Sequence, residues 1–295
     1  MKSPIDLLVP MDWEEYELLD SGNGVKLERY GNYRFARPAP QAVWSPSLPE
    51  VEWQNTDGIF ETGEGENGGH WKISSNAILD PWKMRYKDLI FFAFISGSRH
   101  IGIFPEQAPH WDWISQLINQ SRKQVKVLNL FGYTGIATLA AARAGAMVTH
   151  VDASKRSVRI ARDNQTLAGL SNAPVRWIVD DVFKFVQREV RRQAKYDAII
   201  MDPPKFGRGP KGEVWEFFKL MPFLLENCRS ILSEQPLFIV ITAYTIQASS
   251  LSLYYALEPL VKTYGGELTC GELALKDKSA NRLLSMAIFG RWNSK

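Results

Sequence analysis

Residues Val127-Leu-Asn-Leu-Phe-Gly-Tyr-Thr-Gly-Ile-Ala-Thr-Leu-Ala140 predict a strand, a tight turn and a helix. The run Val127–Leu130 lacks the polar alternation of a half-exposed strand, so both of its faces are expected to be buried. Gly132 and Gly135 bracket a turn in which the backbone bends sharply or comes close to a ligand. Thr134 is a candidate cap for the helix that follows.

A second strand completes this unit. The helix is expected from Ile136 to about Ala144, where Gly145 ends it. The apolar run Met147–Val151 then leads to Asp152. A carboxylate at the end of the second strand of a βαβ unit can accept both hydroxyls of a ribose.

The glycine spacing favours one kind of cofactor. Gly132 and Gly135 form GxxG, whereas GxGxxG is the pattern that brings a backbone against a pyrophosphate. A looser turn suits a nucleoside without phosphates, such as S-adenosylmethionine (SAM), and disfavours a nicotinamide-dependent dehydrogenase. The alternative at this point is a buried strand–helix corner that binds nothing.

Composition and cysteine usage narrow the class of protein to which the chain can belong. The chain has 295 residues, 45% of them apolar and 23% charged, as expected of an ordinary globular protein in one large or two smaller domains. The N-terminus lacks a secretory apolar segment, and the apolar run Leu89–Ile95 is too short to span a membrane, so we expect a cytoplasmic protein. Cys228 and Cys270 are interpreted as core thiols, and the four histidines lack the spacing of a zinc site, so no metal is expected.

Charge is distributed unevenly along the chain. Residues 1–113 hold ten lysines and arginines against seventeen acidic residues, whereas residues 114–295 hold 25 against 15. A basic catalytic half attracts an anionic partner such as RNA. The plain alternative is two domains with different surfaces.

The predicted domains are residues 1–114 and 115–295. The first is expected to be β-rich, with a hairpin turn at Gly22-Asn-Gly24, a mobile loop at Glu61–Gly69 and a strand at His100–Phe104. Seven of the ten tryptophans lie in residues 1–113, and we interpret them as packing residues rather than as a stacking platform for bases.

The second domain is predicted to be α/β. Strands and helices alternate, which indicates a Rossmann-like, doubly wound, seven-stranded and mostly parallel sheet. Its clearest helix is expected to start at Val214 after a flexible Gly207–Gly212 loop, with a kink at Pro222. Two final strands, within 267–275 and 283–292, are expected to pair at the sheet edge.

Ligand-type residues follow four of these strands. Because the carboxyl ends of parallel strands meet at one edge, Asp152, Asp180, Asp181 and Asp202 are expected to converge with the glycine turn. Asp181 is expected to accept from an adenine amine while the Val182 N–H donates to the ring. The alternative for Asp180 and Asp181 is helix N-capping, and at least one of them is expected to do only that.

Asp202-Pro-Pro-Lys-Phe206 predicts the chemistry. Two prolines fix an extended, rigid turn that can aim the Asp202 carboxylate and the Pro203 carbonyl at one amine. Such a pair can align the lone pair of the amine with a methyl donor and accept its proton. Lys205, Arg208 and Lys211 are then expected to contact substrate phosphate, unless they belong to a solvated loop.

These motifs resemble a known family. Asn129–Gly135, Val151–Lys155, Ala161–Asn164, Asp181–Phe183 and Asp202–Phe206 are similar to class I SAM-dependent methyltransferases related to the bacterial enzymes that make 5-methylcytosine in 23S ribosomal RNA. The resemblance covers about residues 100–292. It implies SAM contacts from two loops and a helix start and a target site at the proline motif. The cofactor residues are Phe131, Gly132, Tyr133, Thr134, Gly135, Asp152, Ala153, Ser154, Asp180, Asp181 and Val182, and the catalytic ones are Asp202, Pro203, Pro204 and Lys205.

One departure from that family changes the expected reaction. Methylation of a pyrimidine carbon 5 requires a thiolate that first adds to the ring, and the relatives place this cysteine just after the fifth strand. Here that segment reads Ile241-Thr-Ala-Tyr-Thr245. We therefore expect direct transfer to a nitrogen or oxygen, most simply of ribosomal RNA. The alternatives are a small-molecule or protein acceptor, or a SAM-binding assembly factor without catalysis.

Overall fold

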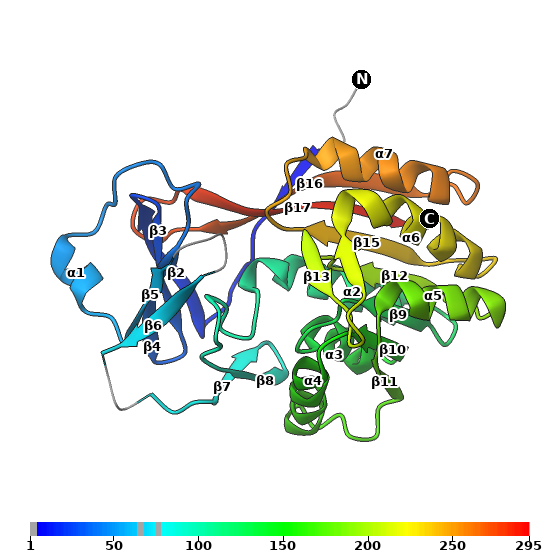
Figure 1. Ribbon diagram of the computed structural model, residues 1–295, viewed down its shortest axis with the longest axis horizontal. Helices are drawn as coiled ribbons and strands as arrows, with labels where there is room; N and C mark the ends of the chain where they lie inside the picture. The colour runs from blue at the N-terminus through cyan, green and yellow to red at the C-terminus, as the bar shows by residue number, and fades with distance from the viewer. Residues whose placement is uncertain (1–4, 64–67, 75–77, 295) are drawn as a thin grey trace. The chain divides into compact units, whose positions relative to one another are not determined.

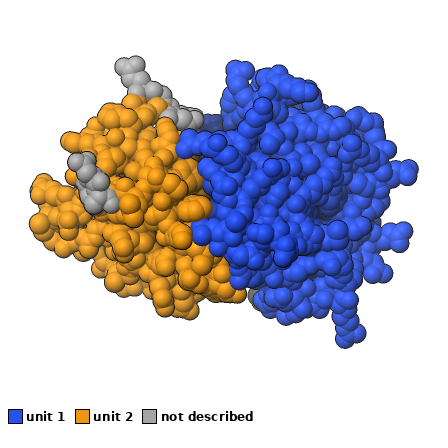
Figure 2. Space-filling model, turned by 90° about the horizontal axis from the view of Figure 1, so that it is seen from below, with its two compact units in different colours: residues 1–8, 109–273, 287–295 blue, residues 9–108, 274–286 orange. Residues whose placement is uncertain are grey.

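The computed structural model describes residues 5–63, 68–74 and 78–294 (Figure 1). The chain divides into two compact units, which are coloured in Figure 2. Unit 1 comprises residues 1–8, 109–273 and 287–295, and unit 2 comprises residues 9–108 and 274–286. This division differs from the predicted domains in three segments, residues 1–8, 109–114 and 274–286, because a single boundary in the sequence cannot represent a chain that returns to its first unit. A split into independently folding domains near residue 114 stays a prediction.

Unit 1 is built on an eight-stranded, mostly parallel sheet of order β1-β16-β17-β15-β12-β9-β10-β11, which confirms the predicted fold class. β9, β10, β11, β12 and β15 are parallel, and β17 is antiparallel to β15. Its strands are β1 (Ile5–Leu8), β9 (Lys126–Leu130), β10 (Met147–Asp152), β11 (Val175–Val179), β12 (Ala198–Met201), β15 (Phe238–Ala243), β16 (Glu267–Lys276) and β17 (Leu283–Asn293).

The eighth strand was missed by the sequence analysis. β1 pairs in parallel with β16, with Ile5 opposite Cys270, so β16 and β17 do not form the edge. Four residues with alternating exposure are too few to distinguish a strand from a loop by pattern alone. β16 and β17 neighbour each other as predicted, and both contribute residues to the two units.

Helices cover both faces of this sheet because successive side chains of each strand point to opposite sides. Leu128 and Leu130 of β9 pack in the cluster with α5 (Val182–Arg191), α6 (Phe217–Ile231) and α7 (Ser250–Val261). Val127 of β9 packs in the cluster with α2 (Ala108–Gln120) and α3 (Ile136–Arg143). The remaining helix is α4 (Lys155–Leu167). This architecture therefore requires a strand that is buried on both faces, as Val127, Leu128 and Leu130 are.

The strand order reverses between β9 and β12. From β9 the chain proceeds outward to β10 and β11, and it then returns to β12 and β15 on the other side of β9. In open α/β sheets the ligand crevice lies at such a switch point, outside the carboxyl ends of the strands. The loops after β9, β10 and β12 therefore define the region in which a site is expected.

Unit 2 contains a five-stranded sheet, β2-β3-β4-β5-β6, and the separate pair β7-β8. The predicted hairpin is confirmed, since Asn23 and Gly24 both have positive φ, 51° and 76°, as a two-residue hairpin turn requires. The elements of this unit are β2 (Tyr16–Gly22), β3 (Val25–Tyr30), β4 (Tyr33–Pro38), α1 (Glu50–Gln54), β5 (Gly58–Thr62), β6 (Gly69–Ile73), β7 (Trp82–Tyr86), β8 (Leu89–Ala93) and the 3-10 turn η1 (Pro105–Gln107).

Aromatic packing builds the core of unit 2. Trp82 stacks on Phe35 at 5.7 Å, and Trp71 meets the same ring edge-on at 5.5 Å. Trp13 and Trp82 are buried, which agrees with the interpretation of these tryptophans as packing residues. Part of the expected mobile loop at residues 61–69 lies outside the described residues.

The strand predicted at His100–Phe104 is wrong. This segment has no regular structure and leads into η1. Gly102 has φ 79°, and a Cβ there would overlap the Phe94 ring at 2.4 Å. A left-handed residue in the middle breaks an extended strand, although the apolar alternation around it suggested one.

Candidate functional site

The loop after β9 has an unusual backbone. Phe131, Tyr133 and Gly135 all have positive φ, of 58°, 49° and 84°. Non-glycine residues in this region are strained and persist only where their surroundings enforce them. Gly135 occupies the N-cap position of α3 with no side-chain cap, so the predicted cap at Thr134 is wrong. The left-handed conformation explains why position 135 is glycine.

Gly132 is required for a different reason, which is close packing. A Cβ at position 132 would lie 2.4 Å from Cε1 of His150. The ring of His150 is fully buried, and burial lowers its pKa to about 3, so it is neutral. The loop after β9 therefore packs directly against an uncharged imidazole.

A polar ladder that the sequence analysis did not identify lies near this loop. Asn129 Nδ2 donates to Thr138 Oγ1 at 2.8 Å, and Thr138 Oγ1 is 2.9 Å from His150 Nδ1. Asn129 and His150 are direct neighbours on β9 and β10. The available signal was a polar residue inside each of two apolar runs. Buried polar groups must be paired, so two such residues at matching strand positions predict a contact.

Asp152 joins the first two loops. Its Oδ2 accepts from the Tyr133 N–H at 2.9 Å, and its Oδ1 accepts from the Ser154 N–H at 2.8 Å. Burial raises the pKa of this carboxyl, and the two backbone bonds act in the opposite direction. A carboxylate has about four acceptor positions, so two backbone donors leave capacity for two hydroxyls. Ala153 lies between Asp152 and Ser154, and Ser154 caps α4 by accepting from Ser157 N at 3.1 Å.

The two aspartates after β11 have different partners. Asp181 is the N-cap of α5, and its Oδ1 accepts from the Lys184 N–H at 2.9 Å. Asp180 accepts from the Asp181 N–H and pairs with Arg188. The other carboxylate oxygen of Asp181, Oδ2, faces Gly209. A Cβ added to Gly209 would lie 3.1 Å from this oxygen. Asp181 thus caps α5 and Asp180 does not, and that one of them does only this stays a prediction. Val182 begins α5 as a buried residue.

The proline motif continues from β12, beside the first loop. The Asp202 N–H donates to the Leu130 carbonyl at 3.3 Å, which ties the ends of β12 and β9 together. Trp215 Nε1 donates to the Pro204 carbonyl at 2.7 Å, and the Phe217 N–H donates to the Lys205 carbonyl at 3.0 Å. Pro203 is buried between these anchored residues. The turn is therefore held on both sides.

A short hairpin replaces the predicted flexible loop. β13 (Phe206–Arg208) pairs with β14 (Val214–Glu216), and α6 starts only at Phe217. The prediction of a helix from Val214 is therefore wrong, because Val214 and Trp215 repeat the helical spacing by chance while pairing as a strand. Pro222 lies inside α6. The ring of Trp215 contacts that of Phe131 at 4.9 Å, so the hairpin also reaches the first loop.

The two thiols lie inside the hydrophobic core. Cys228 in α6 and Cys270 in β16 are both fully buried. Burial raises the pKa of Cys228 to about 12. Within the described ranges, no three His, Cys, Asp or Glu side chains gather as a metal site would require. Across the same residues, no helix combines the length and the apolar character needed to cross a bilayer.

Comparisons with known proteins agree on one family. A family model described as "S-adenosylmethionine-dependent methyltransferase" matches residues 67–233. A crystal structure of a SAM-dependent methyltransferase from Agrobacterium tumefaciens is similar over 98% of this chain and 94% of that chain, with 45% identity and a TM-score of 0.93.

Curated relatives match over shorter stretches. Ribosomal RNA large subunit methyltransferase I of Klebsiella pneumoniae (strain 342) is 42% identical over 82 residues, which is 28% of this chain and 20% of that protein. The enzyme of the same name from Cronobacter sakazakii is 26% identical over 195 residues, covering 62% of this chain and 48% of its own. The chain thus spans from a fifth to about half of the length of these relatives.

Proposed function

Because the chain belongs to the S-adenosylmethionine-dependent methyltransferases, we propose that it transfers a methyl group to RNA, in the first place ribosomal RNA. The curated relatives are named as ribosomal RNA methyltransferases, which supports this acceptor. The proposal depends above all on one hydrogen bond between the two strand ends, which the Asp202 N–H donates to the Leu130 carbonyl. That bond brings the proline motif next to the glycine loop.

The donor groups of the first two loops fit a nucleoside cofactor. We propose that Asp152 accepts the ribose hydroxyls, for which its two backbone bonds leave acceptor capacity. Asp181 Oδ2 and the Val182 N–H are proposed to bind the adenine, while Phe131 to Gly135 bind the amino-acid part. When bound, the cofactor supplies an electrophilic methyl group on a sulfonium sulfur.

The proline motif is proposed to hold the acceptor. Asp202 and the Pro203 carbonyl accept hydrogen bonds from one amine, or Asp202 alone accepts from a hydroxyl, and so direct the lone pair of the acceptor atom to the methyl group. The acceptor then gains a methyl group and loses a proton, which Asp202 accepts and passes to water. Lys205, Arg208 and Lys211 are exposed beside this point and are proposed to contact phosphate.

A covalent thiolate step is not part of the proposal. β15 ends at Ala243, and Tyr244 and Thr245 follow it, which supports the inference that this chain lacks the thiol expected there in the 5-methylcytosine enzymes. A thiol with a pKa of about 12, such as that of Cys228, supplies almost no thiolate at neutral pH. Direct transfer to nitrogen or oxygen is the reaction that the remaining groups support.

Mass spectrometry of ribosomal RNA from a deletion strain tests the acceptor. We expect one methyl group to be missing, and the purified protein with SAM should restore it on the undermethylated RNA. A complete set of methyl groups in the deletion strain would contradict the proposal. In that case a small-molecule or protein acceptor becomes the better assignment.

Salt dependence gives an independent test of RNA binding. Each phosphate contact releases a counterion from a single strand, so affinity should fall steeply with salt, with a slope near −0.7 per contact. Replacing Lys205, Arg208 and Lys211 together by glutamine should reduce this slope by about two units. A slope that does not change in the triple variant would exclude these side chains as phosphate contacts.

A further inference from the structure

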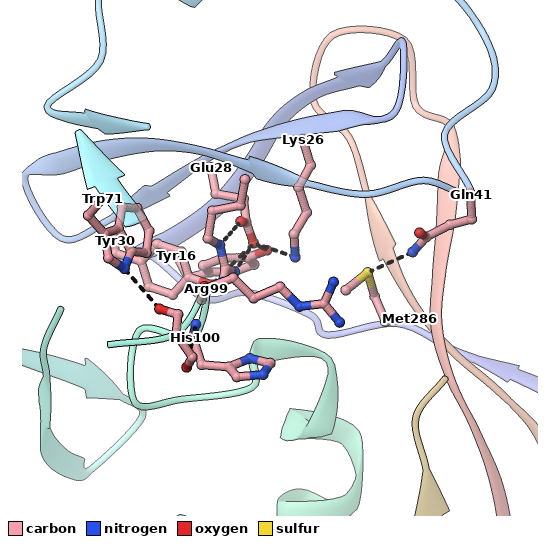
Figure 3. A network of polar contacts seen from close by, with 11 residues as sticks. Tyr16, Lys26, Glu28, Tyr30, Gln41, Trp71, Arg99, His100 and Met286 are labelled. Atoms are coloured by element: carbon pink, nitrogen blue, oxygen red, sulfur yellow. Dashed lines mark hydrogen bonds and ion pairs between the residues drawn. The ribbon is translucent and has the colours of Figure 1, made fainter. Parts of the chain in front are cut away.

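A cluster of charged side chains is buried in unit 2, outside the residues proposed for methyl transfer (Figure 3). Lys26 and Glu28 lie on β3 and Arg37 on β4, and each is at most 5% exposed. Tyr16 and Tyr30 complete the cluster with their hydroxyl groups. Burying a charge costs free energy unless the charge is paired, so each of these groups needs a partner.

Glu28 is the central acceptor, and its capacity is fully used. Arg37 donates to Oε2 at 2.7 Å and to Oε1 at 2.9 Å. Oε1 also accepts from Tyr16 at 2.8 Å and Tyr30 at 3.1 Å, and the Lys26 ammonium lies 3.1 Å away. Five contacts exceed the roughly four acceptor positions of a carboxylate. Glu28 therefore cannot neutralise a further cation.

Arg99 is that further cation. Among the described residues no acceptor lies within hydrogen-bonding distance of its half-buried guanidinium, and burial and the charge of Arg37 lower its pKa. In Figure 3 the guanidinium extends past Glu28 toward Gln41 and Met286, and no dashed contact reaches it. A guanidinium has five N–H donors, so leaving it unpaired in a half-buried position is unfavourable without a ligand.

The backbone that carries Arg99 is held in place. Arg37 Nη1 donates to the Arg99 carbonyl at 2.9 Å, and Trp71 Nε1 donates to the Ser98 carbonyl at 2.9 Å. The Ser96 hydroxyl donates to the His100 carbonyl at 2.6 Å. The unpaired guanidinium is therefore presented by an ordered loop, as a binding site requires.

Positive charge is in excess here. Lys26 and Arg37 interact with Glu28 and Glu106, and Arg99 adds a third positive charge near Arg37. Burial raises the pKa of Glu106. His100 adds no charge near neutral pH, because burial and the neighbouring cations lower its pKa to about 3. Three basic side chains thus lie with two carboxyl groups, which leaves positive charge unbalanced. A phosphate group supplies negative charge of the kind that is missing here.

We propose that Arg99 and Lys26 form a binding site for a phosphate group, with Gln41 and Met286 at its outer side. The planar fork of an arginine binds two phosphate oxygens at once, and Lys26 has two N–H donors beyond the one directed to Glu28. This assignment goes beyond the proposed function, because it does not require RNA to be the methyl acceptor. The phosphate can come from a nucleic-acid strand or from a free phosphorylated molecule.

Calorimetry with inorganic phosphate tests the site on the full chain at constant ionic strength. Arg99→Gln should weaken phosphate binding at least tenfold, since it removes charge-assisted hydrogen bonds. Arg85→Gln, on the exposed side of β7, is the matched control and should bind like wild type. Wild type that binds no phosphate, or Arg99→Gln that binds it equally well, would overturn the proposal.

Further measurements exclude misfolding and identify the source of the phosphate. Arg99→Lys keeps the charge and should retain part of the affinity, and SAM binding should not change in either variant. A loss of SAM binding in both variants would assign Arg99 to the integrity of the fold and refute the proposal. Titration with a short single-stranded oligoribonucleotide then separates two supporting results: affected binding indicates a strand phosphate, and unaffected binding a free phosphorylated molecule.

Discussion

The aspartates proposed for the cofactor are already oriented by backbone N–H groups. Asp152 accepts two such bonds and Asp181 accepts one, so neither needs to reorganise for a nucleoside to bind. Asp202 is placed through the bond of its own N–H to Leu130. Preorganised groups of this kind stabilise a transition state without reorganisation during the reaction.

Replacing Asp202 by asparagine should separate transfer from cofactor binding. The amide keeps the size of the side chain but cannot accept the proton, so transfer should fall about 100-fold or more. SAM affinity, measured by calorimetry, should stay within about threefold, since the cofactor contacts lie on other loops. Asp163→Asn, on the exposed face of α4, serves as the control. Undiminished transfer in the Asp202 variant would remove this residue from the mechanism.

Replacing Gly132 by alanine should distort the loop after β9, which we propose binds the cofactor. The added Cβ would lie 2.4 Å from the His150 ring, and overpacking of this kind costs about 1–3 kcal/mol. We expect a lower unfolding midpoint and weaker SAM binding. Gly97→Ala is the matched change, because a Cβ there meets no atom within 4 Å. Equal stability and SAM affinity in the two variants would show that the loop can move away from His150.

At the scale of the element, the hairpin β13–β14 connects the proline motif to its surroundings. The indole N–H of Trp215 donates a hydrogen bond to the Pro204 carbonyl, and its ring contacts the Phe131 ring. At the far end, Lys184 of α5 pairs with Glu213 at 2.8 Å, and this bond lowers the pKa of Glu213 to about 2. One small element therefore links the loops after β9, β11 and β12.

Trp215→Phe should reduce transfer more than stability. The ring is largely kept, but the donor to Pro204 is lost, which costs about 1 kcal/mol and loosens the turn that aims Asp202. Trp44→Phe removes a comparable bond to the Ser21 carbonyl in unit 2, at 2.9 Å. Both variants should lose similar stability in urea, but only the Trp215 variant should lose turnover. Normal turnover there would mean that the prolines alone fix the turn.

At the scale of the whole molecule, three of the four histidines carry no charge near neutral pH: His110 and His150 are buried, and His100 is partly buried. His100, His110 and His150 each have a pKa of about 3, chiefly because of burial. Both ring nitrogens of His110 lack a partner among the described residues. Such groups resist protonation in the folded state but accept protons readily once unfolded.

Stability should therefore fall steeply in acid. The folded pKa values lie below the unfolded value of 6.5, so this contribution is full above pH 6.5 and is lost as the pH falls toward 3. Each histidine adds about 1.4 kcal/mol per pH unit to the slope in that window. Urea unfolding at several pH values should show a smaller slope for His110→Phe and no change for the exposed His70→Gln. An unchanged slope for His110→Phe would contradict the buried neutral state.

The sequence predicted the central parallel sheet better than the segments between its strands and in unit 2. The run Val127–Leu130 and the carboxylates at the strand ends sufficed for a parallel sheet and for a crevice at its carboxyl edge. Val214 and Trp215 were assigned to a helix, because three residues of a strand carry no periodicity that could compete with the helix after them. The strand predicted at His100–Phe104 failed because apolar alternation does not report the φ angle of Gly102.

What the sequence determined by itself was local. Apolar runs, glycine and proline positions and the carboxylates at the ends of three strands fix the βαβ units, because buried strands and tight turns depend on neighbouring residues. Only the tertiary structure decided which distant residues meet. Ile5 pairs with Cys270, Asn129 lies beside His150, and Arg37 donates both to Glu28 and to the Arg99 carbonyl. These contacts depend on the order and register of the strands. Order and register are selected by the free energy of burial and pairing across the whole fold, which no short stretch of sequence contains.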